Sequence, residues 1–261
     1  MEDEGLNAVT QAAIKKSNFF RTPGRYFVYS AMAGCFCTIG MALACSVAAG
    51  FYSSEALRGA HNFMLGAMFT LSFTMIIFAG AELFTGNVLV MTIGFLQKKI
   101  QLSLLFKILA ICYLANVSGA AFMGLIVHET GILYGPAGEM IIRLVENKAS
   151  LSLAHGFFRG IMCNIMVCLG IWCVSKLKSE SAKMIILFWA VLGFVAPGYE
   201  HSIANAGLFA MALVVNSASG INHQGIILNM LSVTLGNIAG GSIFVALVYW
   251  FSGRENTRQT I

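Results

Sequence analysis

Charge is scarce in this chain: only 10% of its 261 residues are Asp, Glu, Lys or Arg, and 58% are hydrophobic. Soluble domains carry about 25% charged residues, so this chain could not cover a globular surface in water. Its apolar runs are long enough to cross a hydrocarbon core, which takes about 20 helical residues. The composition therefore excludes an ordinary soluble domain and indicates a multi-pass membrane protein.

Metal-ligand and disulfide spacings are missing as well. The seven cysteines lie within apolar runs and form no CxxC pair, whereas a disulfide framework would place them in loops. None of the three prolines follows an asparagine, which excludes the paired Asn-Pro-Ala motifs of an aquaporin-like water or glycerol pore. We therefore expect no metal and no cofactor. A membrane-embedded redox or cofactor-handling enzyme is the alternative class, and the lack of a ligand cluster counts against it.

Six apolar segments are expected to cross the membrane, at about 26–52, 63–97, 102–127, 151–175, 184–216 and 225–252. Lys and Arg are frequent at both ends of the chain and in the second-to-third and fourth-to-fifth connections, and rare elsewhere. The positive-inside rule then places both termini in the cytoplasm. We expect the protein in the cytoplasmic (inner) membrane. Residues 1–25 are predicted to form an interfacial helix, residues 128–150 an extracellular connection and residues 253–261 a cytoplasmic tail.

The second and fifth segments are too long to be single membrane helices. At about 1.5 Å per residue they would span roughly 52 and 50 Å, more than a tilt absorbs. Polar residues interrupt both near the middle: GAELFTGN at 80–87 and GYEHSIAN at 198–205. We expect helix breaks at 80–87 and 197–205.

The two halves of the chain share motifs at nearly constant spacing. G-x-E-x-x-x-x-N recurs at an offset of 118, and L-x-N-x-x-G (LANVSG at 114–119, LGNIAG at 235–240) at an offset of 121. This indicates an internal repeat of three spans each, 26–127 and 151–252. Because three is odd, the second copy is inverted in the membrane. Such repeats with broken helices build transport sites at the midplane. The predicted fold is an all-α membrane protein of six transmembrane helices in two inverted three-helix repeats.

With these motifs the sequence resembles the formate/nitrite transporter family. The likeness covers nearly the whole chain, through SAMAG (30–34), AELFTGN, CNIMVCL (163–169), GYEHSIAN and VTLGN (233–237). It implies an aquaporin-like protomer in a homopentamer within the lipid bilayer. Each protomer would have its own pore for a small monovalent anion of a weak acid, such as formate, nitrite or hydrosulfide, and no nucleic-acid partner is expected.

The resemblance also implies residue roles. The central pore is expected to hold His201, Thr85 and Asn164. Two hydrophobic constrictions would enclose it: a cytoplasmic one of Leu83, Phe84 and Val167, and an outer one of Phe69, Phe73 and Phe194. Some members have leucine at the position of Phe73, which leaves the width of the outer gate open. Lys148 would attract anions to the outer vestibule.

Physical chemistry agrees with such a pore. An apolar slit penalises a bare anion by several kcal/mol or more, but not a protonated weak acid. Histidine, with an ordinary pKa of about 6.5, could supply or share that proton. Glu82, Asn87, Glu200 and Asn205 are predicted to be structural, with the carboxylates capping backbone N–H groups at the breaks. Arg159, inside the fourth span, is either a snorkelling residue or an interprotomer partner. Among the anions we favour hydrosulfide, whose conjugate acid titrates near neutrality.

Overall fold

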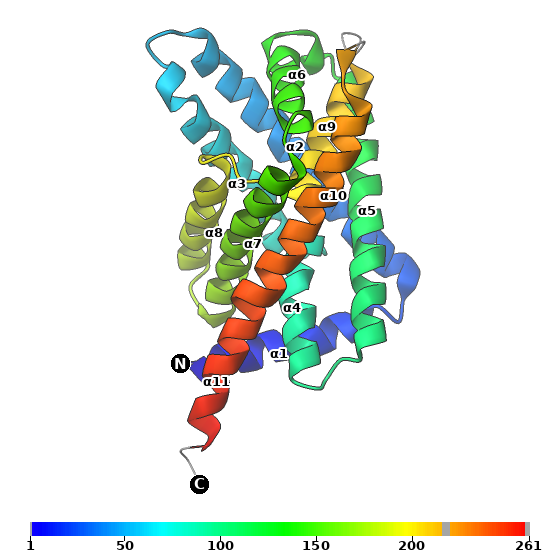
Figure 1. Cartoon of the computed structure of the whole chain (residues 1–261), viewed down its shortest axis with the longest axis vertical. Helices are drawn as coiled ribbons and strands as arrows, with labels where there is room; N and C mark the ends of the chain where they lie inside the picture. Colours follow the sequence, from blue (N-terminus) through cyan, green and yellow to red (C-terminus); the bar gives the residue numbers. More distant parts are fainter. Residues whose placement is uncertain (1, 216–219, 259–261) are drawn as a thin grey trace.

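The computed structural model describes residues 2–215 and 220–258 and is helical throughout those ranges, without a strand (Figure 1). The helices are, in chain order, α1 (Glu2–Phe19), α2 (Pro23–Ser53), η1 (Arg58–Ala60), α3 (His61–Ala79), α4 (Phe84–Leu96), α5 (Leu102–Glu129), η2 (Ile132–Tyr134), α6 (Pro136–Ala149), α7 (Leu153–Lys176), α8 (Glu180–Val195), α9 (Ser202–Val214), α10 (His223–Ala239), the π-helical η4 (Gly240–Leu247) and α11 (Val248–Arg258). The end of the predicted tail (259–261) and of the fifth segment (216) lies outside the described residues.

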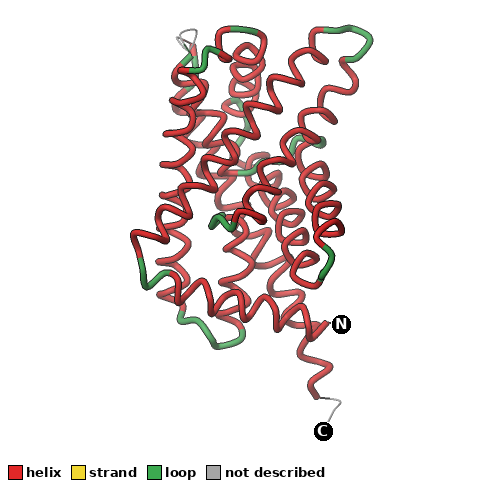
Figure 2. Tube along the Cα trace, turned by 180° about the vertical axis from the view of Figure 1, so that it is seen from behind, coloured by secondary structure: helices red, strands yellow, loops and turns green. Residues whose placement is uncertain are grey.

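The predicted all-α membrane fold with two broken spans is confirmed. Among the described residues, α2, α3 with η1, α5, α7 and α10 with its extension are long and apolar enough to cross a membrane. The second span is divided into α3 and α4, and the fifth into α8 and α9. The interruptions are loops inside the helical bundle (Figure 2). α1 and α11 lie together at one end of the molecule, here called the terminal end; the other is the distal end (Figure 1).

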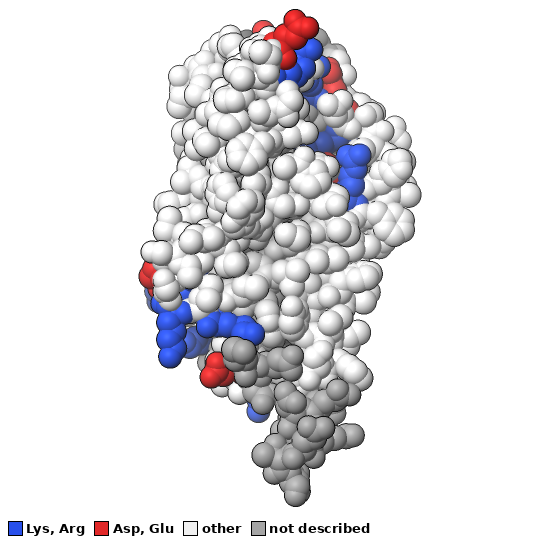
Figure 3. Space-filling model, turned by 90° about the vertical axis from the view of Figure 1, so that its left-hand side faces the viewer, with Lys and Arg blue, Asp and Glu red and all other residues white. Residues whose placement is uncertain are grey.

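Apolar side chains dominate the sides of the molecule. Phe106, Phe122, Phe158 and Ile227 are each 60–67% exposed. In the space-filling view, charged residues gather mostly toward the two ends, and the surface between them is almost wholly uncharged (Figure 3). A largely apolar surface of this kind is unfavourable in water and favourable against lipid or a neighbouring protein.

Both breaks begin at a glycine in the left-handed conformation. Gly80, directly after α3, has φ of 82°, and Gly198, shortly after the last residue of α8, has φ of 80°. Left-handed backbone is readily adopted by glycine and is strained for most other residues. The glycine shared by the two repeat motifs is the C-cap of α3 in the first repeat and lies in the turn that follows α8 in the second.

Asn116, on α5, satisfies the backbone of the first break. Its side-chain Oδ1 accepts a hydrogen bond of 2.8 Å from the N–H of Phe84, the first residue of α4. Its Nδ2 donates to the carbonyl oxygens of Ser30 (2.6 Å) and Glu82 (2.9 Å). A broken helix exposes both donors and acceptors, and one amide can satisfy both kinds. Asn116 therefore connects the break to α2 and α5.

Asn237, on α10, does the same in the second repeat. Its Oδ1 accepts from the N–H of Ser202 (2.9 Å), and its Nδ2 donates to the carbonyl oxygens of Gly160 (2.8 Å) and Glu200 (2.9 Å). The glycine of each L-x-N-x-x-G motif permits the necessary close approach. A Cβ on Gly119 would lie 1.9 Å from the carbonyl oxygen of Ala31, and one on Gly240 2.4 Å from that of Ile161. The motif thus brings an asparagine to each break.

The repeat is longer than the three spans predicted from the sequence. α1 precedes the first repeat and α6 the second, and each sends a lysine to the glutamate of the following break: Lys16 to Glu82 and Lys148 to Glu200. α6 lies within the segment expected to be a connection, 128–150. α1 packs Leu6, Val9 and Ala13 against the bundle, each no more than 6% exposed.

Replacing Asn116 by alanine should destabilise the fold. The variant leaves one buried N–H and two buried carbonyl groups without this partner, and each unsatisfied group costs about 1–3 kcal/mol. We expect the midpoint of thermal unfolding in detergent to fall by many degrees. Ser118→Ala is the matched control, because its exposed hydroxyl bonds only to Leu114 of its own helix. Equal unfolding midpoints for the two variants would contradict the role of Asn116.

Candidate functional site

The two half-helices α4 and α9 begin close together in the middle of the molecule. Thr85 is the second residue of α4, and His201 is the N-cap of α9. The Nε2 atom of His201 lies 2.9 Å from Oγ1 of Thr85. Both residues are buried, with 4% and 0% exposure. The structure therefore joins the two repeats through a hydrogen bond between two residues predicted for the central pore.

The cap contact determines how this hydrogen bond is directed. Nδ1 of His201 accepts a hydrogen bond of 3.1 Å from the backbone N–H of Ala204. An accepting Nδ1 carries no proton, so the neutral imidazole has its proton on Nε2. The imidazole thus donates to the Thr85 hydroxyl oxygen, and the hydroxyl proton of Thr85 is left to donate to another acceptor.

Asn164, on α7, holds backbone carbonyl groups beside this pair. Its Nδ2 donates to the carbonyl oxygens of Thr85 (3.3 Å) and Asn237 (2.6 Å). Its buried Oδ1 has no hydrogen-bond partner within the part of the chain that the structure describes. Asn164 is therefore next to the His201–Thr85 pair, in contact with the Thr85 backbone and not with the imidazole.

A very small apolar cavity of about 10 Å³ adjoins His201. Besides His201, its lining includes five of the predicted constriction residues: Phe69, Phe73, Leu83, Val167 and Phe194. The Phe194 ring stacks on the imidazole at a centroid distance of 5.7 Å, and Phe69 meets Phe194 edge-on at 6.4 Å. Residues from α3, α7, α8 and the first break thus close around the imidazole.

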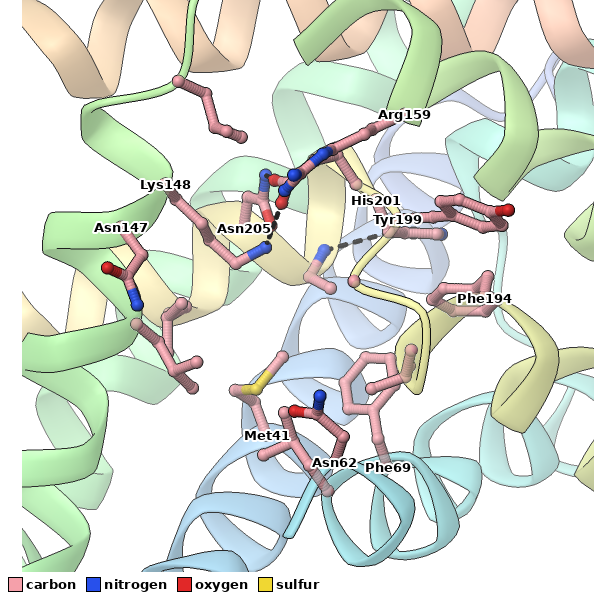
Figure 4. A pocket seen from close by; sticks show the side chains of 18 residues that line it. Met41, Asn62, Phe69, Asn147, Lys148, Arg159, Phe194, Tyr199, His201 and Asn205 are labelled. Carbon is pink, nitrogen blue, oxygen red and sulfur yellow. Dashed lines mark hydrogen bonds and ion pairs between the residues drawn. The ribbon is translucent and has the colours of Figure 1, made fainter. Parts of the chain in front are cut away.

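A larger cavity of about 190 Å³, here called the distal cavity, lies on the other side of these rings (Figure 4). Phe69, Phe194 and His201 line both cavities and so separate them, whereas Phe73 lines only the small one. Phe84 lines neither: its ring packs edge-on against Tyr113 at 5.0 Å. Phe84 follows Leu83 directly in the chain, and its place in a cytoplasmic constriction stays a prediction.

The expectation that the break carboxylates cap backbone N–H groups is wrong. Glu200, only 2% exposed, pairs with Lys148 (2.7 Å) and accepts from Asn205 (2.6 Å). In the first repeat Glu82 pairs with Lys16 (2.5 Å) and accepts from Asn87 (3.0 Å). The asparagines of α5 and α10 cap the breaks instead, because a carboxylate cannot also satisfy the free carbonyl groups there.

Sequence reasoning missed several residues of this region. Lys16 and Asn237 were not assigned roles. The repeat offset relates Asn237 to Asn116 and could have indicated it. For Lys16, the signal was that a lysine precedes each repeat. Ser72 was also missed: it lines the small cavity, and its buried hydroxyl has no hydrogen-bond partner among the described residues. Its position three residues after Phe69, on the same helical face, could have indicated it.

The cysteines and other metal-ligand types are dispersed in the described part of the chain. The seven cysteines are free thiols, and no three His, Cys, Asp or Glu side chains there are placed to hold a metal ion. The polar groups at the centre are instead hydroxyl, imidazole and amide groups, which can hydrogen-bond a small solute.

The chain is similar over almost its whole length to known membrane transport proteins. The family model described as formate/nitrite transporter matches residues 3–251. The chain belongs to the formate/nitrite transporter family. It is 34% identical over 253 residues to the nitrite transporter NirC of Escherichia coli (strain K12), covering 97% of this chain and 91% of that protein.

Solved structures agree with this assignment. An FNT family ion channel matches with a TM-score of 0.88 and 30% identity, over 95% of this chain and 98% of that one. A pentameric formate channel with formate bound matches with a TM-score of 0.78 and 26% identity, over 88% and 97% of the two chains. This family member is thus a membrane channel or transporter and not an enzyme, and the enzyme alternative finds no support.

The buried Lys148–Glu200 pair should show strong coupling. Lys148→Met leaves a buried carboxylate without its cation, and breaking such a pair from one side costs about 3–5 kcal/mol. We expect a large fall in the thermal unfolding midpoint in detergent, and partial recovery in Lys148→Met/Glu200→Gln. The exposed Lys183–Glu180 pair supplies the control, Lys183→Met, which should change little. A double variant no more stable than the single one would argue against the coupling.

Proposed function

We propose that this family member is a homopentameric channel that conducts small monovalent anions of weak acids, with His201 and Thr85 at the centre of each protomer's pore. The observation that carries the proposal is the 2.9 Å hydrogen bond between these side chains, where two half-helices begin beside an apolar cavity of about 10 Å³. A water molecule needs at least about 10–15 Å³ of such volume. A hydrated ion therefore does not fit.

The apolar rings should select for the neutral form of the permeant. Moving a bare anion into an apolar site costs several kcal/mol even after relaxation, and Phe69, Phe73 and Phe194 offer no charge to offset it. A protonated weak acid avoids this penalty. Formate, nitrite and hydrosulfide all have such neutral forms, whereas chloride does not at physiological pH.

The half-helix ends supply positive potential without a charged side chain in the centre. Helix N-termini carry roughly half a positive charge each, and α4 and α9 both begin at the His201–Thr85 pair. An anion at the centre could accept the hydroxyl proton of Thr85. Protonation of Nδ1 would remove the Ala204 cap of α9. The geometry therefore favours a hydrogen-bonding role for His201 over storage of an extra proton.

The proposed topology places the terminal end in the cytoplasm and the distal cavity outside, in the cytoplasmic membrane. The arginines and lysines of the N-terminal and second-to-third segments support this orientation by the positive-inside rule. The exposed apolar sides allow contacts with neighbouring protomers and lipid. The likeness to a pentameric formate channel supports five copies.

The preferred anion is proposed only as a class. A neutral conjugate acid near physiological pH favours hydrosulfide, whereas the names of the relatives point to nitrite and formate. All three are small enough to be compared in one assay.

Flux in proteoliposomes with the purified protein tests the proposal. Formate, nitrite, hydrosulfide and chloride are compared at two pH values, for wild type and His201→Ala. We expect weak-acid flux well above chloride, rising as pH falls and strongly reduced in the variant. Equal leakage of the four anions in both proteins would sink the proposed mechanism.

Flux should depend on the hydroxyl group of Thr85 and not only on the size of its side chain. Thr85→Val keeps the shape but removes the donor to the permeant and the acceptor for His201. Because one such hydrogen bond contributes about 0.5–1.5 kcal/mol, flux should fall by roughly two- to twelvefold. Thr85→Ser retains the hydroxyl and should conduct nearly as wild type. Similar flux through the valine and serine variants would remove the hydroxyl from the mechanism.

A further inference from the structure

Arg159 presents an unpaired guanidinium to the distal cavity. It lies on α7, near the start of that helix, and lines the cavity together with Lys148, Glu200 and His201. Its guanidinium has no hydrogen bond and no ion pair to the described residues of this protomer, and its side chain is exposed. In Figure 4 it points toward the same part of the cavity as the Lys148 side chain. An arginine inside a membrane-spanning segment usually has a function or a partner.

The internal repeat shows that the scaffold does not require an arginine here. The backbone carbonyl of Arg159 accepts a hydrogen bond of 3.3 Å from the N–H of Glu200. In the first repeat, the carbonyl of Tyr29 accepts in the same way from the N–H of Glu82, at 3.1 Å. The two positions are therefore equivalent, and the backbone contact is made equally well by a tyrosine.

Among the charged residues that line the distal cavity, Arg159 is the cation without a paired carboxylate. Lys148 is neutralised by Glu200 at 2.7 Å. Lys16 and Glu82 pair in the same way toward the terminal end, where the equivalent position is the uncharged Tyr29. The two repeats thus match in their buried ion pairs and differ by one positive charge. An anion approaching from the distal side meets that charge before it reaches Phe69 and Phe194.

We propose that Arg159 is an anion-binding residue of the distal vestibule, which captures the permeant before the aromatic constriction and raises apparent affinity from that side only. The inference rests on the proposed function. Arginine stays charged at physiological pH and presents parallel N–H donors that match two oxygens of one anion. Formate and nitrite have two such oxygens, and hydrosulfide has a single sulfur. Arg159 therefore favours oxyanions over hydrosulfide.

The test measures half-saturation concentrations for nitrite and hydrosulfide in proteoliposomes of defined orientation, with substrate added on either side. Loss of a charged hydrogen-bond partner corresponds to about a tenfold weakening. Arg159→Gln should raise the nitrite value about that much from the distal side and leave the terminal-side value unchanged. Arg159→Lys should weaken nitrite but hardly affect hydrosulfide, because only the paired donors are lost.

Arg143→Gln is the matched control. It removes the same charge from the same end of the molecule, but Arg143 donates to the Tyr52 hydroxyl (2.7 Å) and does not line the distal cavity. Its half-saturation values should equal those of wild type. Equal shifts in both variants would indicate general surface charge and overturn the assignment.

Two further measurements separate the remaining outcomes. If Arg159→Gln breaks the oligomer in native mass spectrometry, the guanidinium pairs with a neighbouring protomer and the inference fails. Nitrite-dependent thermal stabilisation reports binding without flux. Stabilisation of wild type that Arg159→Gln abolishes would uphold this inference even if the protein proved not to conduct. An unchanged response in Arg159→Gln would overturn it even if conduction were shown.

Discussion

The structure depends on satisfying backbone groups where two helices are interrupted at membrane depth. An unpaired peptide group there costs several kcal/mol and has no bulk water to replace its partner. Asn116 and Asn237 solve this problem with one amide each, donating to carbonyl groups and accepting from the first N–H of the next half-helix. Because the breaks are held in this way, the half-helix ends, Thr85 and His201 have fixed positions.

The buried ion pairs belong to the same arrangement. Glu82 and Glu200 follow the left-handed glycines, and each bonds to an asparagine five residues later and to a lysine from the helix that precedes its repeat. α1 and α6 are thereby attached to the breaks. Two nearly neutral carboxylate–lysine pairs flank a central site with no full charge, so the half-helix dipoles and the Thr85 hydroxyl dominate its polarity.

The span arithmetic and the repeat motifs were enough to predict the broken helices, since segment length and polar interruptions are local features. They also pointed to Glu82, Glu200 and the asparagines, but not to what those side chains contact. Capping by the nearby carboxylates was the expectation from local sequence. It failed because the side chains that satisfy the backbone groups, Asn116 and Asn237, come from α5 and α10. The contact between Phe84 and Tyr113 was hidden for a similar reason: Tyr113 lies on another helix, which no spacing along the α4 segment reveals.

In an inverted repeat, residues that support the fold recur at equivalent positions of the two halves. Positions where the two halves differ therefore indicate functions that belong to one side of the membrane. The glycines, glutamates, asparagines and lysines are matched in both halves, and therefore belong to the fold. Arg159 and Tyr29 share the backbone contact but not the side chain. A sequence motif search ranks the matched residues first, because repetition makes them visible. The position of Arg159 and Tyr29 is recognised as equivalent only when the structure shows their two carbonyl groups in the same contact. A side chain there can change to suit one substrate or one direction of flux without disturbing the breaks.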